Sequence, residues 1–124
     1  AFGKNVKNVL PILIGVTLMG RLNYQDNQST IVLISALFGT TLAPLAGRYG
    51  NIAGIIAGAM HLTLVMNIGY LHGGVNLYNN GFSGGLVASI LVPILEAFQL
   101  HRTNQRALRR PVDPADEVEV DRTN

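Results

Sequence analysis

The sequence predicts an all-α, multi-pass integral membrane protein, and three observations lead to this fold class. Arg48 is the only formally charged side chain between Asn27 and Leu95, whereas about a quarter of an average globular chain is charged. The same region divides into long apolar runs separated by short polar stretches. The charge gathers instead in the last 24 residues, which hold five arginines and five acids. We therefore expect a transmembrane domain over residues 1–100 and a cytoplasmic, charged, largely disordered tail over residues 101–124.

Four apolar segments are expected to insert into the membrane, and the first two differ in length. The first, about residues 8–22, contains only about eleven consecutive apolar or small residues, whereas a helix needs roughly 20 to cross a hydrocarbon core. It therefore either crosses as a short helix or re-enters from one side. The second, about residues 30–47, follows two capping candidates, Ser29 and Asn27, and meets Pro44 in its last turn.

The third and fourth segments lie on either side of a glycine-rich stretch. The third, about residues 52–71, is interrupted by His61 and Asn67. At a rise of about 1.5 Å per residue, such a helix is roughly 30 Å long, which matches one bilayer core. The fourth, about residues 82–100, contains Pro93, and the composition after it changes to Arg, Asp and Glu.

Basic residues predict how the chain is oriented. Four arginines follow the last segment directly: Arg102, Arg106, Arg109 and Arg110. Because positive residues favour the cytoplasmic side, the C-terminus is expected in the cytoplasm, and Arg48, two spans earlier, falls on the same side. Lys4 and Lys7 would lie inside if the first segment crosses the membrane and outside if it re-enters, so both topologies stay open.

The third segment also predicts close helix packing and one polar candidate. Gly50, Gly54 and Gly58 recur every four residues, which gives the helix a narrow face that another helix can approach. His61 lies one turn further along that face. An ionisable residue at membrane depth is a functional candidate, although a hydroxyl or carbonyl of a neighbouring helix could equally satisfy its ring. Glu96, near the cytoplasmic end, is better explained as a snorkelling anchor.

The stretch from Leu71 to Gly85 combines five glycines and three asparagines between two apolar segments. Non-helical backbone at membrane depth survives only where protein buries it or water reaches it, so this stretch predicts a broken helix beside a cavity. Free backbone donors at such helix ends bind polar solutes in many transporters. The alternative is an ordinary hairpin loop between two spans. The candidate substrate-binding residues are His61, Asn76, Tyr78, Asn79, Asn80, Gly81, Ser83 and Gly84.

Several kinds of chemistry are not expected from this sequence. Gly81 to Gly85 satisfies the G-x-S-x-G pattern of hydrolases, but no alternating strand precedes Ser83, so an intramembrane hydrolase is only a remote alternative. The histidines have no zinc-site spacing, and there is no cysteine and no phosphate-binding loop, so we expect no metal, no cofactor and no enzymatic activity. The chain also lacks a basic groove with interleaved aromatic residues, which argues against nucleic acid.

The run LHGGVNLYNNGFSGGLVA, residues 71–88, lies within a longer stretch, Leu37 to Phe98, that resembles an uncharacterised family of bacterial multi-pass membrane proteins. The likeness is to the C-terminal part of that family, which is known only as a domain of unknown function. It implies a bacterial inner-membrane protein with further spans upstream, of which this chain is a fragment. A smaller set of residues is similar to a repeated motif of urea-transporter-like channels: Tyr78-Asn79, Phe82 and Gly84. That similarity implies two repeats with re-entrant half-helices around a narrow pore for small neutral solutes.

We therefore interpret the sequence as a transporter or channel for a small polar solute, neutral or anionic, recognised by backbone donors and asparagine amides of the broken-helix region. The main alternative is a non-transporting membrane scaffold or assembly module, whose glycine faces pack against the rest of the protein or a partner. The expected partners are the lipid bilayer, the remainder of the full-length chain, the solute and, in a homo-oligomer, a second copy. Whether residues 76–84 meet water separates the two interpretations.

Overall fold

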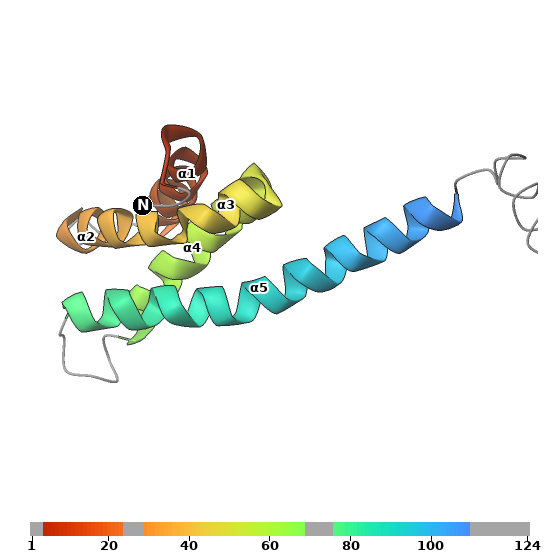
Figure 1. Ribbon diagram of the computed structural model, residues 1–124. Coiled ribbons are helices and arrows are strands. Elements are labelled where there is room, and N and C mark those ends of the chain that lie inside the picture. Colours follow the sequence, from red (N-terminus) through yellow and green to blue (C-terminus); the bar gives the residue numbers. More distant parts are fainter. Residues whose placement is uncertain (1–3, 24–28, 69–75, 110–124) are drawn as a thin grey trace, which may run out of the picture. The chain divides into compact units, whose positions relative to one another are not determined.

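The computed structural model describes residues 4–23, 29–68 and 76–109, and the regular structure in these ranges is entirely helical (Figure 1). The elements are α1 (Val6–Leu22), α2 (Ser29–Gly39), the 3-10 helix η1 (Thr40–Leu42), α3 (Ala43–Tyr49), α4 (Asn51–Ile68) and α5 (Asn76–Leu108). The chain divides into two compact units, a helical bundle within residues 1–94 and a C-terminal segment within residues 95–124. The predicted all-α class is confirmed for the part of the chain that the structure describes.

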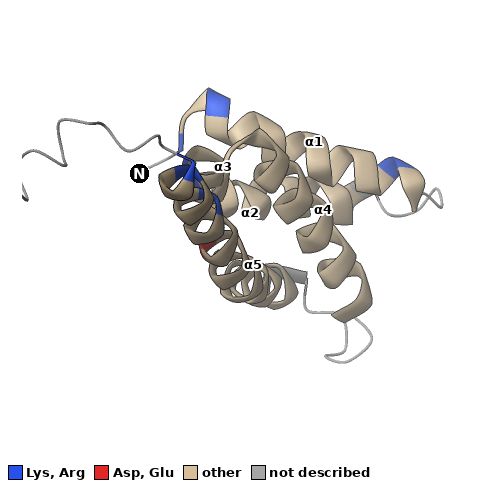
Figure 2. Cartoon of the chain, turned by 90° about the vertical axis from the view of Figure 1, so that its right-hand side faces the viewer, with Lys and Arg blue, Asp and Glu red and all other residues tan. Residues whose placement is uncertain are grey.

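Three helical stretches are long and apolar enough to cross a membrane: Thr30–Tyr49, Asn51–Ile68 and Tyr78–Leu108. The sequence predicts four membrane-inserted segments, but α1, with 17 residues, is shorter than these three. Within the bundle the charged residues lie near helix ends, so the middle parts of its helices carry no charge (Figure 2). This distribution suits helices whose middle parts lie in hydrocarbon.

The second apolar segment is not one continuous α-helix, because η1 divides it into α2 and α3. Pro44 has no amide donor, and its ring would collide with the carbonyl of the residue four positions earlier in a continuous α-helix. The turn before it tightens into η1, where the hydroxyls of Thr40 and Thr41 donate to the carbonyls of Leu37 and Phe38 at 2.7 Å each. Residues 30–47, predicted as one helix, are two helices joined by a tight turn.

α1 and α4 make the most extensive helix contact of the bundle, because glycines let their backbones touch. A Cβ atom at Gly58 of α4 would meet the carbonyl oxygen of Ile12. A Cβ atom at Gly15 of α1 would meet the carbonyl oxygen of Ile55 in the same way. Gly54 faces α1 as well. Main chains approach this closely only where side chains are absent, so these three glycines set the distance between the two helices.

Gly50 does not belong to this packing face, although its spacing from Gly54 and Gly58 predicts that it would. It caps the C-terminus of α3 with a φ of +99°, and a Cβ atom there would have nothing within 4 Å. Glycine adopts a positive φ readily, whereas residues with a side chain do so at a cost. Gly50 is therefore the turn residue between α3 and α4 and not a packing residue.

We expect Gly50→Ala to lower the free energy of unfolding by about 1 kcal/mol, because alanine adopts a positive φ less readily than glycine. Gly81→Ala is the matched control, since Gly81 lies inside α5 and an added Cβ would have nothing within 4 Å. The two variants are compared by thermal unfolding, followed as loss of the monodisperse peak in size-exclusion chromatography. A Gly50→Ala protein as stable as Gly81→Ala would contradict this account of the turn.

α1 runs alongside α4 in the same direction and over most of its length. Near the start of α1, a Cβ atom at Gly47 would meet the side chain of Asn8. Near its end, a Cβ atom at Gly20 would lie 3.6 Å from the side chain of Leu62. Since Gly47 precedes α4 and Leu62 lies in its second half, α1 is a single helix beside α4 and does not turn back.

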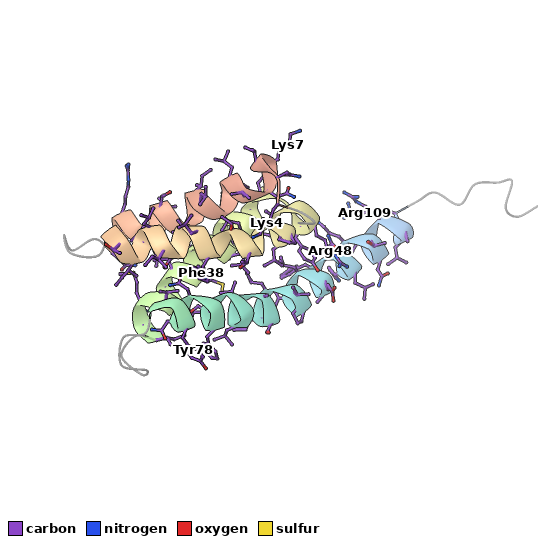
Figure 3. The ribbon with its side chains drawn as sticks, turned by 60° about the vertical axis from the view of Figure 1, so that its left-hand side comes forward. Lys4, Lys7, Phe38, Arg48, Tyr78 and Arg109 are labelled. Atoms are coloured by element: carbon purple, nitrogen blue, oxygen red, sulfur yellow. The ribbon has the colours of Figure 1, made fainter. Side chains whose placement is uncertain are left out.

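The parallel course of α1 and α4 gathers basic residues at one end of the bundle. Lys4 lies just before α1, Lys7 in its first turn and Arg48 in the last turn of α3, and Figure 3 shows these three at the end opposite to Tyr78. Arg21, in the last turn of α1, lies toward the other end. Three of the four basic residues described in the bundle are thus at one end.

α5 begins earlier and ends later than the sequence predicts. The fourth segment is predicted over residues 82–100, but α5 runs from Asn76 to Leu108. Its first turns contain the glycine- and asparagine-rich residues 76–85, which are helical and do not form a break. Residues 101–108, at the start of the predicted charged tail, are helical as well. The rest of the predicted break, residues 71–75, and the rest of the tail beyond Arg109 lie outside the described residues.

Candidate binding site in the helical bundle

Five polar side chains are buried together inside the bundle, where three helices meet. One comes from α2, one from α4 and three from the first turns of α5: Ser35, His61, Asn79, Asn80 and Ser83. Each of these side chains is at most 1% exposed. We refer to the five residues as the buried polar cluster.

His61 lies at the centre of the buried polar cluster, in contact with both neighbouring helices. Its ring is adjacent to the side chain of Asn80 in α5 and to the backbone of Ser35 in α2. A Cβ atom at Gly39 would lie 3.4 Å from its Cδ2, and one at Gly84 would lie 3.9 Å from its Cε1. Glycines in α2 and α5 therefore allow both helices to approach the imidazole ring closely.

Most polar atoms of the cluster have no hydrogen-bond partner among the described residues. Both ring nitrogens of His61, both polar side-chain atoms of Asn79 and the hydroxyls of Ser35 and Ser83 belong to this group. The ring of His61 is adjacent to Asn80 and Ser35 without reaching hydrogen-bond geometry with either. An unpaired buried polar group costs roughly 1–3 kcal/mol, and nearly all buried polar atoms of folded proteins are paired. The cluster therefore offers donors and acceptors to polar atoms of another molecule.

The packing of α5 explains why its glycine- and asparagine-rich start is helical. The buried residues in its first turns are Asn79, Asn80, Ser83, Gly84 and Val87, and the exposed ones are Tyr78, Gly81, Phe82 and Gly85. The buried positions follow the helical period, so one face of α5 packs on the bundle. Burial of this face outweighs the low helix propensity of glycine and asparagine, which is a weak preference that tertiary contacts often override.

Of the eight residues predicted to bind a solute, the structure brings five together: His61, Asn79, Asn80, Ser83 and Gly84. Tyr78 and Gly81 lie on the exposed face of α5, where the Tyr78 ring stacks on Phe82 with centroids 6.5 Å apart. The side chain of Asn76 lies outside the described part of the chain. Sequence reasoning missed Ser35, whose signal is a single hydroxyl in the middle of the apolar helix α2.

A cavity of about 260 Å³ lies between α5 and the region formed by η1 and α3. We refer to it as the α3–α5 cavity. Its polar lining comes from Thr41, Arg48 and Tyr49, and its remaining walls are apolar, with Ala88 and Val92 contributed by α5. The guanidinium carbon of Arg48 lies 5.4 Å from the centroid of the Tyr49 ring, within the range of a cation–π interaction.

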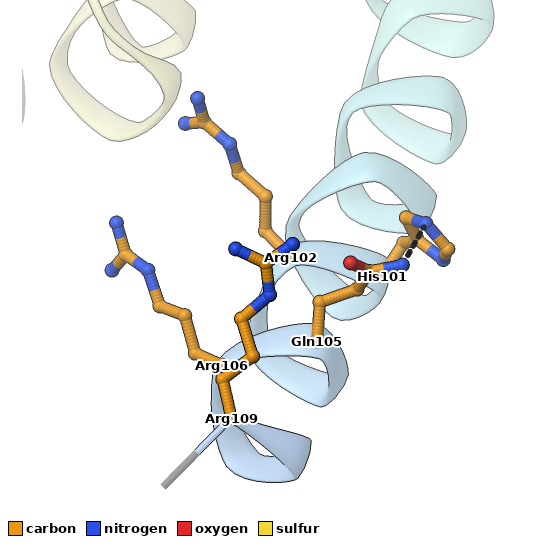
Figure 4. Close-up of a pocket in the computed structure, with 5 residues that line it drawn as sticks. All are labelled: His101, Arg102, Gln105, Arg106 and Arg109. Atoms are coloured by element: carbon orange, nitrogen blue, oxygen red, sulfur yellow. Dashed lines mark hydrogen bonds between the residues drawn. The ribbon is translucent and has the colours of Figure 1, made fainter.

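The C-terminal segment has a basic surface of its own. Arg102, Arg106 and Arg109 recur at intervals of about one helical turn and line a hollow together with His101 and Gln105 (Figure 4). The Nε2 atoms of His101 and Gln105 are 3.4 Å apart. All five side chains are exposed. This surface is therefore a solvated basic helix face.

The described residues contain no group of three or more His, Cys, Asp or Glu side chains that could hold a metal ion. Ser83, the serine of the G-x-S-x-G pattern, lies within α5 with helix on both sides. A nucleophile elbow instead needs a strand before the serine and a helix after it. The geometry around Ser83 is therefore that of a buried helix residue.

The surface of the bundle defines the class of protein. Large apolar side chains such as Leu33, Leu37 and Ile52 are exposed, while polar side chains are buried inside. A soluble protein rarely exposes so many large apolar residues together. With three helices of spanning length, this arrangement is compatible with an α-helical integral membrane protein.

The chain belongs to a family described as protein of unknown function (DUF1576), whose pattern matches residues 1–97. No curated protein and no solved structure matches the chain, so the similarity to urea channels finds no support there. The family description assigns no activity, and the functional argument therefore rests on the buried polar cluster.

Proposed function

We propose that the protein is a membrane transporter or channel for a small polar solute and that the buried polar cluster is its binding site. One observation carries the proposal: polar side chains of three helices are buried together, and most of their polar atoms have no partner among the described residues. In hydrocarbon surroundings each unpaired polar group costs several kcal/mol unless protein, water or a solute satisfies it. An apolar side chain would fill the same space without that cost, so a binding role accounts for the polar residues better than packing does.

The chemistry of the cluster fits a neutral or anionic solute. The amide of Asn79, the hydroxyls of Ser35 and Ser83 and the neutral imidazole of His61 can each donate and accept hydrogen bonds. The described residues of the bundle include no Asp or Glu, so no carboxylate is present there to balance a bound cation. A solute that exchanges hydrogen bonds with amides and hydroxyls matches this lining.

The basic residues support an orientation for the proposed transporter. Lys4, Lys7 and Arg48 gather at one end of the bundle, and positive residues favour the cytoplasmic side. In this orientation α1 crosses the membrane as a short helix. Because Val92 of α5 lines the same cavity as Arg48, α5 leaves the bundle at this end, and the C-terminus is cytoplasmic. We also propose, from the family resemblance, that the membrane is the bacterial inner membrane.

The scaffold alternative draws on a different face of α5. Gly81 and Gly85 are exposed, and a Cβ atom at either would have nothing within 4 Å. Another helix could approach α5 closely at these glycines, as helices do at small residues in membranes. In this alternative, the bundle assembles with further helices through this face of α5 and transports no solute.

We expect a cysteine at position 79 to react with a small, membrane-impermeant thiol reagent, although the side chain that it replaces is fully buried in the bundle. Since this chain has no cysteine, Asn79→Cys is placed in the full-length protein with any other cysteine removed. The reagent is added to intact cells and to inverted membrane vesicles. Val87→Cys, an apolar residue that is also fully buried on the same face of α5, is the matched control and should stay unlabelled.

The labelling experiment separates the transporter from the scaffold. Reaction at position 79 that urea or acetate slows would support a site open to water and solute, and the protecting solute would indicate the substrate class. If the Asn79→Cys protein is folded and inserted but is labelled no more than Val87→Cys, the result would favour the scaffold alternative.

A further inference from the structure

We infer that the basic helix face at the end of α5 binds the phosphate groups of anionic phospholipids in the membrane that α5 crosses. The face is formed by Arg102, Arg106 and Arg109, with His101 and Gln105 beside them. It belongs to the C-terminal segment, whereas the buried polar cluster belongs to the helical bundle. The inference does not depend on the transport function proposed above.

The length of α5 brings this face to the membrane surface. α5 has 33 residues, and at a rise of about 1.5 Å per residue it is about 50 Å long, whereas a hydrocarbon core is about 30 Å thick. Part of the helix therefore extends beyond the hydrocarbon, even when the helix is tilted. Large apolar side chains are exposed along α5 up to Leu100, and the exposed residues that follow directly are polar or basic. The arginines thus begin at the depth of the lipid headgroups.

The three arginines lie on one face of α5. Arg102, Arg106 and Arg109 follow each other at intervals of four and three residues, which brings them to the same side of an α-helix. Figure 4 shows their side chains extending from that side of the helix end. With His101 and Gln105 they line a hollow of about 270 Å³. Guanidinium groups are therefore presented together to a ligand outside the helix.

The described residues supply no counter-charge for this face. Glu96 is the only acidic residue among them, and none of the three arginines forms an ion pair within that part of the chain. All three side chains are exposed. A membrane surface that contains anionic lipids attracts such basic residues where a transmembrane helix leaves the hydrocarbon. Charge complementarity therefore favours anionic headgroups as the ligand of the face.

The use of arginine indicates a phosphate ligand. Every basic residue of the chain after Lys7 is an arginine, and Arg110 directly follows the face in the sequence. A guanidinium can donate two parallel hydrogen bonds to two oxygens of a phosphate, whereas the ammonium of lysine acts as a point charge. The chemical class that fits is a phospholipid with a net negative charge, such as phosphatidylglycerol.

The inference is tested by measuring the enrichment of phosphatidylglycerol beside the face. A bimane fluorophore is attached to Gln105→Cys in the full-length protein, with any other cysteine removed, and the protein is reconstituted in bilayers of phosphatidylcholine and phosphatidylglycerol. Fluorescence quenching is compared between two preparations, in which one lipid or the other carries a spin label high on its acyl chain. A basic residue at an anionic membrane surface contributes about 1 kcal/mol, which corresponds to about a fivefold preference, so we expect phosphatidylglycerol to be enriched about fivefold or more.

Replacing the arginines tests both their charge and their shape. The combination of Arg102→Gln, Arg106→Gln and Arg109→Gln should abolish the enrichment. Lysine at the same three positions should keep part of it, because an ammonium retains the charge and loses the paired donors. Since the three side chains are exposed, neither set of substitutions should change the thermal midpoint of the protein.

Two controls show whether the effect belongs to this face. The combination of Lys4→Gln, Lys7→Gln and Arg122→Gln removes the same number of positive charges elsewhere in the chain and should keep the enrichment. Asn104→Cys places the fluorophore on the side of α5 away from the arginines and should report a smaller enrichment.

Several results would overturn the inference. Equal quenching by the two lipids would mean that the face does not select anionic lipid, as expected if the acids of the C-terminal tail neutralise the arginines instead. Enrichment that survives the three glutamine substitutions, or that is as large at position 104 as at position 105, would mean that this face is not the binding surface. Enrichment that is lost in inorganic phosphate, and kept in sodium chloride of the same ionic strength, would assign the face to a soluble phosphate.

Discussion

Gly58→Ala is expected to destabilise the helical bundle strongly and to lower the yield of folded protein. The added methyl group would meet the carbonyl oxygen of Ile12 and lie 3.2 Å from its Cα, and neither atom is the flexible end of a side chain. The contact can be relieved only if α1 and α4 move apart, and these two helices form the most extensive contact of the bundle. Overpacking typically costs about 1–3 kcal/mol and sometimes more, and a clash with backbone belongs at the upper end. Such a loss is a large share of the 5–15 kcal/mol that typically stabilises a folded protein.

The measurement is the yield of monodisperse protein after extraction in mild detergent, together with its thermal midpoint. Gly15→Ala should behave like Gly58→Ala, because its Cβ would meet the carbonyl oxygen of Ile55 across the same contact. Gly85→Ala is the matched control, since an added Cβ there has nothing within 4 Å and alanine favours the helix. Normal yield and midpoint for Gly58→Ala would mean that α1 and α4 do not approach each other as described.

The class of the fold could be predicted from composition, but the ends of its helices could not. The near absence of charge between Asn27 and Leu95 is enough to predict apolar helices of spanning length. The division of residues 30–47 could have been predicted from Pro44, because proline excludes a regular α-helix in the preceding turn. The start of α5 is different, since glycine and asparagine favour a break locally and only burial of one helix face in the bundle makes the segment helical.

The sequence predicted several residues of the candidate site from their types, but it did not predict the structure that brings them together. His61 and Asn79 were identified as polar residues in apolar surroundings, and the structure buries both in one cluster. The predicted reason for the cluster, a broken helix with free backbone donors, is wrong for residues 76–85, because α5 is continuous there. Tyr78 and Gly81 were included because sequence proximity does not reveal which face of a helix a residue occupies. Ser35 joins the cluster through contacts between helices, and its only signal in the sequence is a single hydroxyl in the middle of the apolar helix α2.

The largest functional effect is expected from His61→Leu. Leucine is close to histidine in size and has no polar atoms, so the variant removes two unpaired ring nitrogens from the bundle interior. Replacing unpaired polar atoms by apolar ones in a buried site is neutral or stabilising. The thermal midpoint should therefore stay the same or rise. If His61 binds the solute, loss of a hydrogen bond of about 1.4 kcal/mol should lower solute flux about tenfold.

Lower solute flux together with an unchanged or higher thermal midpoint would distinguish a solute-binding role of His61 from a packing role. Flux is measured by stopped-flow swelling of proteoliposomes that contain the full-length protein, with urea as the neutral solute and acetate as the anionic one. His101→Leu is the matched control, because it makes the same chemical change at an exposed residue of the C-terminal segment and should alter neither quantity. Unchanged flux in His61→Leu would remove His61 from the proposed site. A fall in both flux and thermal midpoint would show that the imidazole holds the helices together, since a residue whose only role is to bind solute can be replaced by leucine without loss of stability.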